Sequence, residues 1–271
     1  MKRLAGLMIL ACGCVAAGPA NQPASVPATE PTAASAPSTA TAPAVDAAAR
    51  KLLDQLEQAG KDHPRIQADV EYEVLMRKVG DRETRWGQVK FQRAEGDEPA
   101  RFHIAFDVLR QGDGPKIADK VEYAFDGQWL TELKHRIRQQ TLYQVAAEGE
   151  KIDAFRIGRG PFPMPFGQKA DDMLACFEPS TRPPADGDPK DTDYLRLVTR
   201  PEHAKDIQFT DVEMWIDRAT HLPVRLVSRD RKKDRTTVVF SNLKTDVEFD
   251  KSVFRPGRKL GWEYHVKRLG E

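Results

Sequence analysis

The chain has 271 residues, 40% of them hydrophobic and 31% charged, which is enough for a globular domain with a sizeable core. Its 42 Lys and Arg balance 41 Asp and Glu, and this balance argues against nucleic acid as a partner, because phosphate binding needs a basic surplus. Two of the three cysteines, Cys12 and Cys14, lie near the N-terminus, so an internal disulfide framework and a zinc quartet are excluded.

Residues 1–17 have the features of an export signal. Lys2 and Arg3 precede the apolar run Leu4–Leu10, which is too short for a spanning helix of about 20 residues. The run Ile9-Leu10-Ala11-Cys12 resembles the lipobox of bacterial lipoproteins, in which Cys12 would carry the lipid, whereas Val15-Ala16-Ala17 offers an ordinary cleavage site. We therefore expect an exported, periplasmic protein, either released after Ala17 or anchored to a membrane through Cys12.

A linker separates the signal from the domain. Residues 18–45 consist almost entirely of Ala, Pro, Ser, Thr, Val and Gln and lack an apolar period, so we expect them to be disordered. Asp46 is a plausible N-cap, after which one stripe of an amphipathic helix comprises Ala49, Leu52, Leu53 and Leu56, and Gly60 would end this helix. We expect one domain over residues 46–271.

From Ile66 the hydrophobic period changes to two, which predicts strands with one buried face. Asp126-Gly127 is typical of a hairpin turn, and Ile207–Pro256 contains four alternating runs separated by turns at Asp217–Thr220 and Arg229–Asp234. We count about ten strands with short connections, which predicts one continuous antiparallel sheet. No βαβ pattern occurs, so a nucleotide-binding sheet is excluded.

A proline-rich segment, Gly158–Gly167, interrupts this pattern and is followed by a short helix predicted over Lys169–Phe177 and a polar loop over Pro179–Pro189. Large open sheets curl. The predicted fold is therefore α+β: a single curled antiparallel sheet, or unclosed half β-barrel, whose concave face is covered by the N-terminal and mid-chain helices. That face is either a lipid pocket or an ordinary packed core.

Sequence motifs for catalysis are missing. The six histidines have no metal-ligand spacing, and neither a Gly-x-Ser-x-Gly elbow nor a phosphate-binding glycine loop occurs. We expect no catalytic residues, no metal and no cofactor.

From about Asp46 to the C-terminus, the chain resembles the periplasmic outer-membrane lipoprotein carrier (LolA-like) family. The order and spacing of several short motifs carry this resemblance: Gly87–Arg93, Arg101-Phe102, Asp126–Leu130, Asp217–Val224, Phe240–Lys244 and Phe249–Pro256. The resemblance implies a half-barrel cavity that holds the acyl chains of lipoproteins and carries them between the inner and outer membranes. It also implies partners in the inner- or outer-membrane lipoprotein machinery.

The resemblance further implies that Arg93 latches the lid helices through hydrogen bonds to backbone carbonyls. Ala94 and Glu95 follow it, whereas the family has a proline after this arginine, and a solvent-facing strand arginine is the alternative. On the predicted apolar face, the cavity wall would comprise Val89, Phe91, Phe102, Ile104, Phe106, Tyr123, Trp129, Met214 and Leu226. The rim would comprise Leu52, Leu56, Phe162, Met164 and Phe166.

The leading functional hypothesis is non-catalytic binding and transport of lipid or lipoprotein acyl chains across the periplasm. The alternative is an envelope-stress sensor or regulatory binding module on the same fold. A hydrolase that uses the cavity as its substrate pocket is the third hypothesis.

Overall fold

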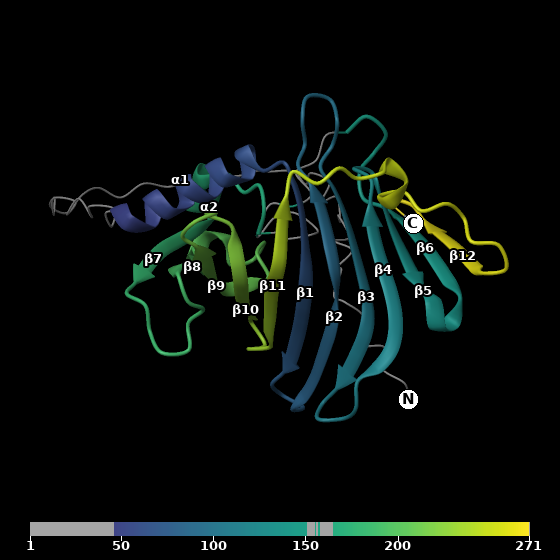
Figure 1. Cartoon of the computed structure of the whole chain (residues 1–271), viewed down its shortest axis with the longest axis horizontal. Helices are drawn as coiled ribbons and strands as arrows, with labels where there is room; N and C mark the ends of the chain where they lie inside the picture. The colour runs from purple at the N-terminus through teal and green to yellow at the C-terminus, as the bar shows by residue number, and fades with distance from the viewer. Residues whose placement is uncertain (1–45, 151–154, 156, 158–164, 271) are drawn as a thin grey trace, which may run out of the picture.

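The computed structural model describes residues 46–150, 155, 157 and 165–270 (Figure 1). The expected export signal and linker, with Cys12, lie outside the described residues, as do Phe162 and Met164.

The described residues form two helices and one sheet of twelve strands, in the order β12-β6-β5-β4-β3-β2-β1-β11-β10-β9-β8-β7. The elements in chain order are α1 (Ala47–Asp62), β1 (Arg65–Met76), β2 (Asp81–Gln92), β3 (Arg101–Gln111), β4 (Ile117–Phe125), β5 (Trp129–Lys134), β6 (Gln139–Gln144), α2 (Ala170–Cys176), β7 (Phe177–Arg182), β8 (Thr192–Thr199), β9 (Phe209–Asp217), β10 (Pro223–Asp230), β11 (Arg235–Thr245) and β12 (Glu263–Lys267). The sheet curls without closing, and β12 and β7 are its two edges (Figure 1). The prediction of an unclosed, curled sheet with two helices is confirmed.

The sheet consists of two antiparallel meanders. Strands β1 to β6 pair in sequence, and so do β7 to β11. The ladder between β1 and β11 joins the two meanders in the middle of the sheet, with Tyr72 opposite Val238. At one edge β12 pairs in parallel with β6, so the expectation of a wholly antiparallel order is wrong at that strand.

The strand count of about ten is too low by two short edge strands. The first is β7, which starts directly after α2 and contains Pro179, in a stretch predicted as a helix end and a proline loop. Proline is tolerated there because an edge strand leaves some of its N–H groups unpaired. The second is β12, a mostly exposed strand of five residues. Conversely, Ile207–Pro256 forms three strands rather than four, because β11 runs unbroken to Thr245 and is followed by a single 3₁₀ turn.

Helix α1 begins where the sequence predicts and ends two residues later than predicted. The Asp46 carboxylate accepts hydrogen bonds from the backbone N–H groups of Ala48 and Ala49, at 2.9 and 3.4 Å. Gly60 remains helical, and His63 leaves the helix with φ −121° and ψ 75°. Pro64 explains this end, because a residue before proline is disfavoured in the α conformation.

The Asp217 turn connects β9 to β10 as the sequence predicts. Asp217 Oδ1 accepts hydrogen bonds from the N–H groups of Ala219 and Thr220 and from the Thr220 hydroxyl, at 2.8 to 3.1 Å. His221 then adopts a left-handed conformation with φ 53°, and Leu222 is buried directly after it. The turn therefore inserts an apolar side chain into the core at the start of β10.

The interior contains two main apolar clusters. The first covers the inner face of the long strands β1 to β5 and reaches Phe240 on β11. The second lies beneath α1 and α2 on the inner face of β8 and β9. The partly buried Leu226 contacts both clusters, so the two share a boundary at β10.

Candidate functional site

An apolar row crosses five strands on the inner face of the long half of the sheet. Strand pairing places side chains from β1, β2, β3, β4 and β5 opposite one another in the order Ile66, Phe91, Phe102, Phe125 and Leu130. Each is 2% exposed or less. Directly paired residues share a face of a sheet, so this row is one continuous aromatic and aliphatic wall.

Among the described residues, the wall is covered by a segment that belongs to no helix or strand. We call the described residues between β6 and α2, namely Phe155, Ile157 and Pro165–Gln168, the covering segment. The ring of Phe155 meets the rings of Phe91, Phe102 and Phe125 edge-on, with centroids 5.3, 5.7 and 5.8 Å away. Such edge-to-face contacts between aromatic rings are attractive beyond their buried area.

Phe166 covers the neighbouring part of the wall. Its ring lies 5.7 Å from Phe91 and 5.1 Å from Phe240, and it is 1% exposed. The buried amide of Gln168 holds the covering segment together, because it accepts from the Ile157 N–H at 3.0 Å and donates to the Phe155 carbonyl at 2.8 Å. The two rings are therefore held on the wall by one internally hydrogen-bonded segment.

The C-terminal end of α1 contacts the covering segment at a pair of glycines. A side chain at Gly60 would place its Cβ 3.0 Å from the backbone of Gly167 and 4.0 Å from the guanidinium of Arg93. Gly167 has φ 73°, a left-handed conformation that suits glycine, and lies against Phe91. The absence of side chains at both glycines lets the helix and the covering segment approach closely.

Arg93 lies at this junction. Its backbone N–H donates to the Pro64 carbonyl at 2.7 Å, directly after α1, and its side chain extends towards Gly60 and Gly167. The Nη1 atom is buried, and within the described part of the chain it has no hydrogen-bond partner. The position of Arg93 between helix and covering segment suits the predicted latch, but the predicted hydrogen bonds to backbone carbonyls are not seen among the described residues.

Glu57 ties the two helices together. Its carboxylate accepts from the backbone N–H of Ala170, the first residue of α2, at 2.8 Å, and pairs with Lys61 at 2.7 Å. The hydrogen bond with Lys61, followed by the one with Ala170, lowers the pKa of Glu57. At the other end of α1, Asp46 also accepts from the Thr181 hydroxyl at 3.0 Å, which fixes the helix to β7.

The residues predicted to form the cavity wall are divided between the two apolar clusters. Those in the first cluster are Val89, Phe91, Phe102, Ile104, Phe106 and Tyr123. Met214 lies in the second cluster under α1, and Leu226 touches both. Of the predicted rim, Leu56 and the partly buried Leu52 lie in the second cluster and Phe166 lies in the first.

Trp129 does not share the wall. Its partner across the ladder is Gln144, while Phe125 pairs with Leu130, so Leu130 is the residue of β5 that faces the row. The Trp129 ring lies 5.9 Å from the guanidinium of Arg268, near the C-terminus. Residues 130 to 133 of β5 are all buried, so the alternation of burial does not reveal which face of this strand is turned inward.

Sequence reasoning also missed residues that the structure places at the site. Phe125 continues the alternation of Tyr123 and Val121, and that signal could have identified it. Leu130 follows from pairing with Phe125. Phe155 and Gln168 carry no such signal, because they lie in a segment without a strand or helix period.

The opposite, outer face of the sheet is polar. A shallow hollow of about 480 Å³ lies over β1 to β4, lined among others by Gln88, His103 and Glu122. Glu122 lies 3.0 Å from His103 and also contacts His135. These hydrogen bonds, the one from His103 first, lower the pKa of Glu122 to about 2.

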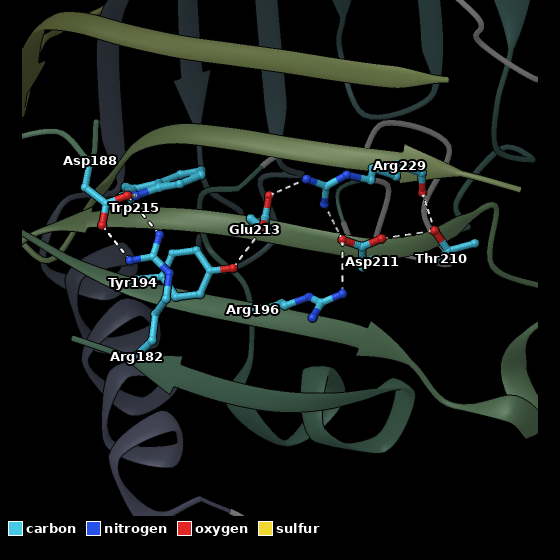
Figure 2. A network of polar contacts seen from close by, with 9 residues as sticks. All are labelled: Arg182, Asp188, Tyr194, Arg196, Thr210, Asp211, Glu213, Trp215 and Arg229. Carbon is cyan, nitrogen blue, oxygen red and sulfur yellow. Dashed lines mark hydrogen bonds and ion pairs between the residues drawn. The ribbon is translucent and has the colours of Figure 1, made fainter. Parts of the chain in front are cut away.

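A polar network covers the outer face of β8 to β10 (Figure 2). Asp188 accepts hydrogen bonds from the Arg182 guanidinium and the Trp215 indole, both at 2.7 Å, while Glu213 pairs with Arg229 at 2.8 Å. The Arg182 guanidinium, which also stacks 3.8 Å from the Tyr194 ring, lowers the pKa of Asp188. This face is held by directed polar contacts, in contrast to the apolar inner face.

The fold and the site together define a class: an α+β protein with an unclosed, curled sheet whose apolar inner face is covered by one segment over β1 to β5 and by two helices over β8 and β9. Across the described ranges, no helix is long and apolar enough to cross a membrane. Nor do any three His, Cys, Asp or Glu side chains in those ranges form a group suited to a metal ion.

Known structures with a similar fold include members of the family that the sequence resembles. A LolA superfamily protein from Nitrosomonas europaea is 11% identical, with a TM-score of 0.34 over 76% of this chain and 96% of its own. An uncharacterized conserved protein from Thermus thermophilus is 13% identical, with a TM-score of 0.45 over 82% and 99%. The Pseudomonas aeruginosa MucA/MucB complex matches at 19% identity and a TM-score of 0.40, over 78% of this chain and 62% of that one.

No family model matches the chain, and no curated protein matches it by sequence. The TM-scores above lie below 0.5, so the function of this protein is not inferred from these structural similarities.

Proposed function

We propose that the protein binds acyl chains of lipids or lipoproteins on the inner face of its half-barrel, without catalysis, and transports them across the periplasm. The observation that carries this proposal is the apolar row from Ile66 to Leu130, which is covered by Phe155 and Phe166 of one loop segment. Since the described residues of the covering segment belong to no strand of the sheet, the segment can leave the wall while the ladders of the sheet stay intact.

An acyl chain would take the place of the two covering rings. Burial of methylene groups against the wall contributes about 0.8 kcal/mol for each CH₂. Binding also breaks the contacts of Phe155 and Phe166 with Phe91. The net binding free energy is therefore smaller than the sum of the contributions of the buried methylene groups. Arg93, Gly60 and Gly167 mark the place where cover and helix meet, and we propose Arg93 as the latch of the closed form.

Bound lipid provides the direct test. The protein is purified without detergent, extracted with organic solvent, and the extract is examined by mass spectrometry for acyl species. In parallel, a fluorescent fatty acid is titrated into the delipidated protein and displaced with palmitate. An extract without acyl species, together with no saturable binding of the probe, would refute the proposal.

Neighbouring residues of β3 offer a matched pair of variants. Ile104 belongs to the inner wall, whereas Ala105, the next residue, lines the hollow on the outer face. Ile104→Glu places a charge on the proposed binding surface and should weaken probe binding at least tenfold, because an ionised carboxylate is strongly disfavoured against an acyl chain. Ala105→Glu should leave binding unchanged. Circular dichroism shows whether both variants fold.

The membrane anchor is tested separately. If Cys12 carries a lipid, labelled palmitate enters the wild-type protein in bacterial cells and does not enter the Cys12→Ser variant. If neither protein is labelled, the chain is cut after Ala17 and released, which is the form expected of a diffusing carrier.

A further inference from the structure

Two loops lie side by side at the β12 end of the sheet. One is the turn between β5 and β6, and the other is the loop of residues 257–262 that leads into β12 (Figure 1). The rings of His135 and Trp262 lie 4.9 Å apart, and the Glu263 N–H donates to the Arg138 carbonyl at 2.9 Å. These contacts bring segments more than 100 residues apart in the sequence into one surface.

This surface exposes apolar side chains. Leu260 is 94% exposed and Ile137 is 54% exposed. Four of the seven large hydrophobic residues exposed in the described part of the chain belong to the β12 end: Ile137, Leu260, Val266 and Leu269. A gathering of exposed apolar side chains, unlike a single one, marks an interaction surface.

The same surface is basic. Residues 255–269 contain five Lys or Arg and one Asp or Glu, whereas the whole chain carries 42 and 41. Arg136 and Arg138 add to this excess from the β5–β6 turn, and both are exposed. Two nearby acidic side chains are already paired: Asp119 lies 3.4 Å from Arg136, and Glu263 lies 2.9 Å from His265. We call Arg136, Ile137, Arg138, Arg258, Lys259 and Leu260 the C-terminal edge patch.

We propose that the C-terminal edge patch docks the protein on the surface of an anionic lipid bilayer. Leu260 and Ile137 would insert at the boundary between headgroups and acyl chains, while Arg258, Lys259 and Arg138 would meet the lipid phosphates. Membrane-surface segments combine these two contributions, apolar insertion and attraction to anionic lipid. Trp262, two residues after Leu260, has the amphipathic ring that favours the interfacial region.

The charge and the apolar side chains of the patch favour an anionic bilayer over a second copy of the chain or a nucleic acid. A second copy of the chain, related by a twofold axis, would place two basic patches against each other and is disfavoured. Duplex nucleic acid would complement the charge but has no apolar layer into which Leu260 could insert. The docking site is distinct from the inner wall, because β6 and β12 lie at the sheet edge beyond the five strands that carry the aromatic row.

The proposal is tested by co-sedimentation with vesicles. The protein carries Cys12→Ser so that no acyl anchor contributes, and the vesicles contain either phosphatidylcholine alone or an equal mixture with phosphatidylglycerol. We expect binding to the anionic vesicles that weakens as NaCl is raised from about 50 to about 500 mM, and at least tenfold weaker binding to phosphatidylcholine.

Two variants separate the two contributions. Leu260→Ser should weaken binding to the anionic vesicles about tenfold, as expected when one inserted leucine is lost. The double variant Arg258→Gln, Lys259→Gln should weaken it about 25-fold, or roughly fivefold for each basic residue. Val79→Ser is the matched control, because Val79 is 62% exposed and follows Arg77 and Lys78, but lies in the β1–β2 hairpin. It should bind as the parent does.

Several results would overturn the proposal. Equal binding to both kinds of vesicle would exclude charge recognition, and unchanged binding of both patch variants would exclude this surface. An equal loss in Val79→Ser would mean that any exposed apolar residue suffices. Analytical ultracentrifugation that finds a dimer in the parent and a monomer in Leu260→Ser would make the patch a chain-to-chain interface. Binding of a monomeric fluorescent fatty acid should be unchanged in Leu260→Ser, so a failure of docking is distinguishable from a failure of acyl binding.

Discussion

Replacement of Phe155 by alanine tests whether the cover of the inner wall is a lid or a permanent part of the core. Loss of a buried phenylalanine costs about 3–5 kcal/mol in a packed interior. Phe155 is 4% exposed and contacts three rings edge-on, but it belongs to a loop segment that can relax into the space left behind. We therefore expect a loss near the lower end, about 3 kcal/mol, in the free energy of unfolding measured with urea and tryptophan fluorescence.

The lid hypothesis predicts a second effect of the same change. If Phe155 stabilises only the covered form, a loss of about 3 kcal/mol raises the population of the uncovered form about 150-fold. The apparent affinity for a fluorescent fatty acid should then rise, by up to about 100-fold. A variant that loses the expected stability while its affinity for the probe stays at the wild-type value would refute the reasoning, because the segment would then be ordinary core.

Phe254→Ala is the matched control for this experiment. Phe254 is 1% exposed and meets Phe249 edge-on at 5.8 Å, far along the chain from the covering segment. Its loss should lower the free energy of unfolding by about 3 kcal/mol as well. Because Phe254 belongs to neither main apolar cluster, the affinity of this variant for the fatty acid should equal that of the wild type.

Arg93→Leu should speed uptake of the fluorescent fatty acid about fivefold in stopped-flow mixing, corresponding to about 1 kcal/mol of lost latch contacts; unchanged uptake and release would eliminate the latch. Glu122→Gln should lower the free energy of unfolding by up to about 3 kcal/mol at neutral pH, because the hydrogen bonds from His103 and His135 lower the pKa of Glu122 to about 2. Because this pKa is lowered, the ionised Glu122 stabilises the fold fully above pH 4.5, and this stabilisation is lost as the pH falls towards 2. The urea midpoints of wild type and variant should therefore converge between pH 4.5 and pH 2. A difference that stays constant over this range would contradict the stabilising role of Glu122. Asp217→Ala removes an acceptor of three hydrogen bonds and should lower the free energy of unfolding by about 1–2 kcal/mol in urea titrations, without changing fatty-acid affinity.

The sheet could be predicted from the sequence because most of its strands bury one face and expose the other, which gives an alternation of apolar and polar residues. Alternation fixes which residues point inward, so Phe91, Phe102 and Phe106 are found together in one cluster. The Asp217 turn was also predictable, since its side chain supplies the hydrogen bonds that shape the local backbone. These features depend on neighbours in the sequence or on a period of two.

The errors have physical causes of a different kind. β7 and β12 are edge strands. β7 contains Pro179 and has no buried residue after Phe177, and β12 is mostly exposed, so neither shows the alternation of a strand with one buried face. Trp129 lies on the face opposite to the predicted one: β5 is buried at consecutive residues, so only the pairing of Phe125 with Leu130 shows which face is turned inward. Phe155 reaches the wall through a loop, and the position of a loop is set by tertiary contacts.

The ladder between β1 and β11 affects how the chain folds during its synthesis. β1 ends at Met76 and β11 begins at Arg235, so during synthesis the first meander keeps an open edge on a long central strand until almost the whole chain has emerged. An unpaired strand edge of this kind can recruit other chains, and a pairing over such a sequence distance is slow to form. We therefore expect newly made protein to need protection of β1 until β11 arrives, and a product truncated before Arg235 to keep an unpaired edge that other chains can pair with.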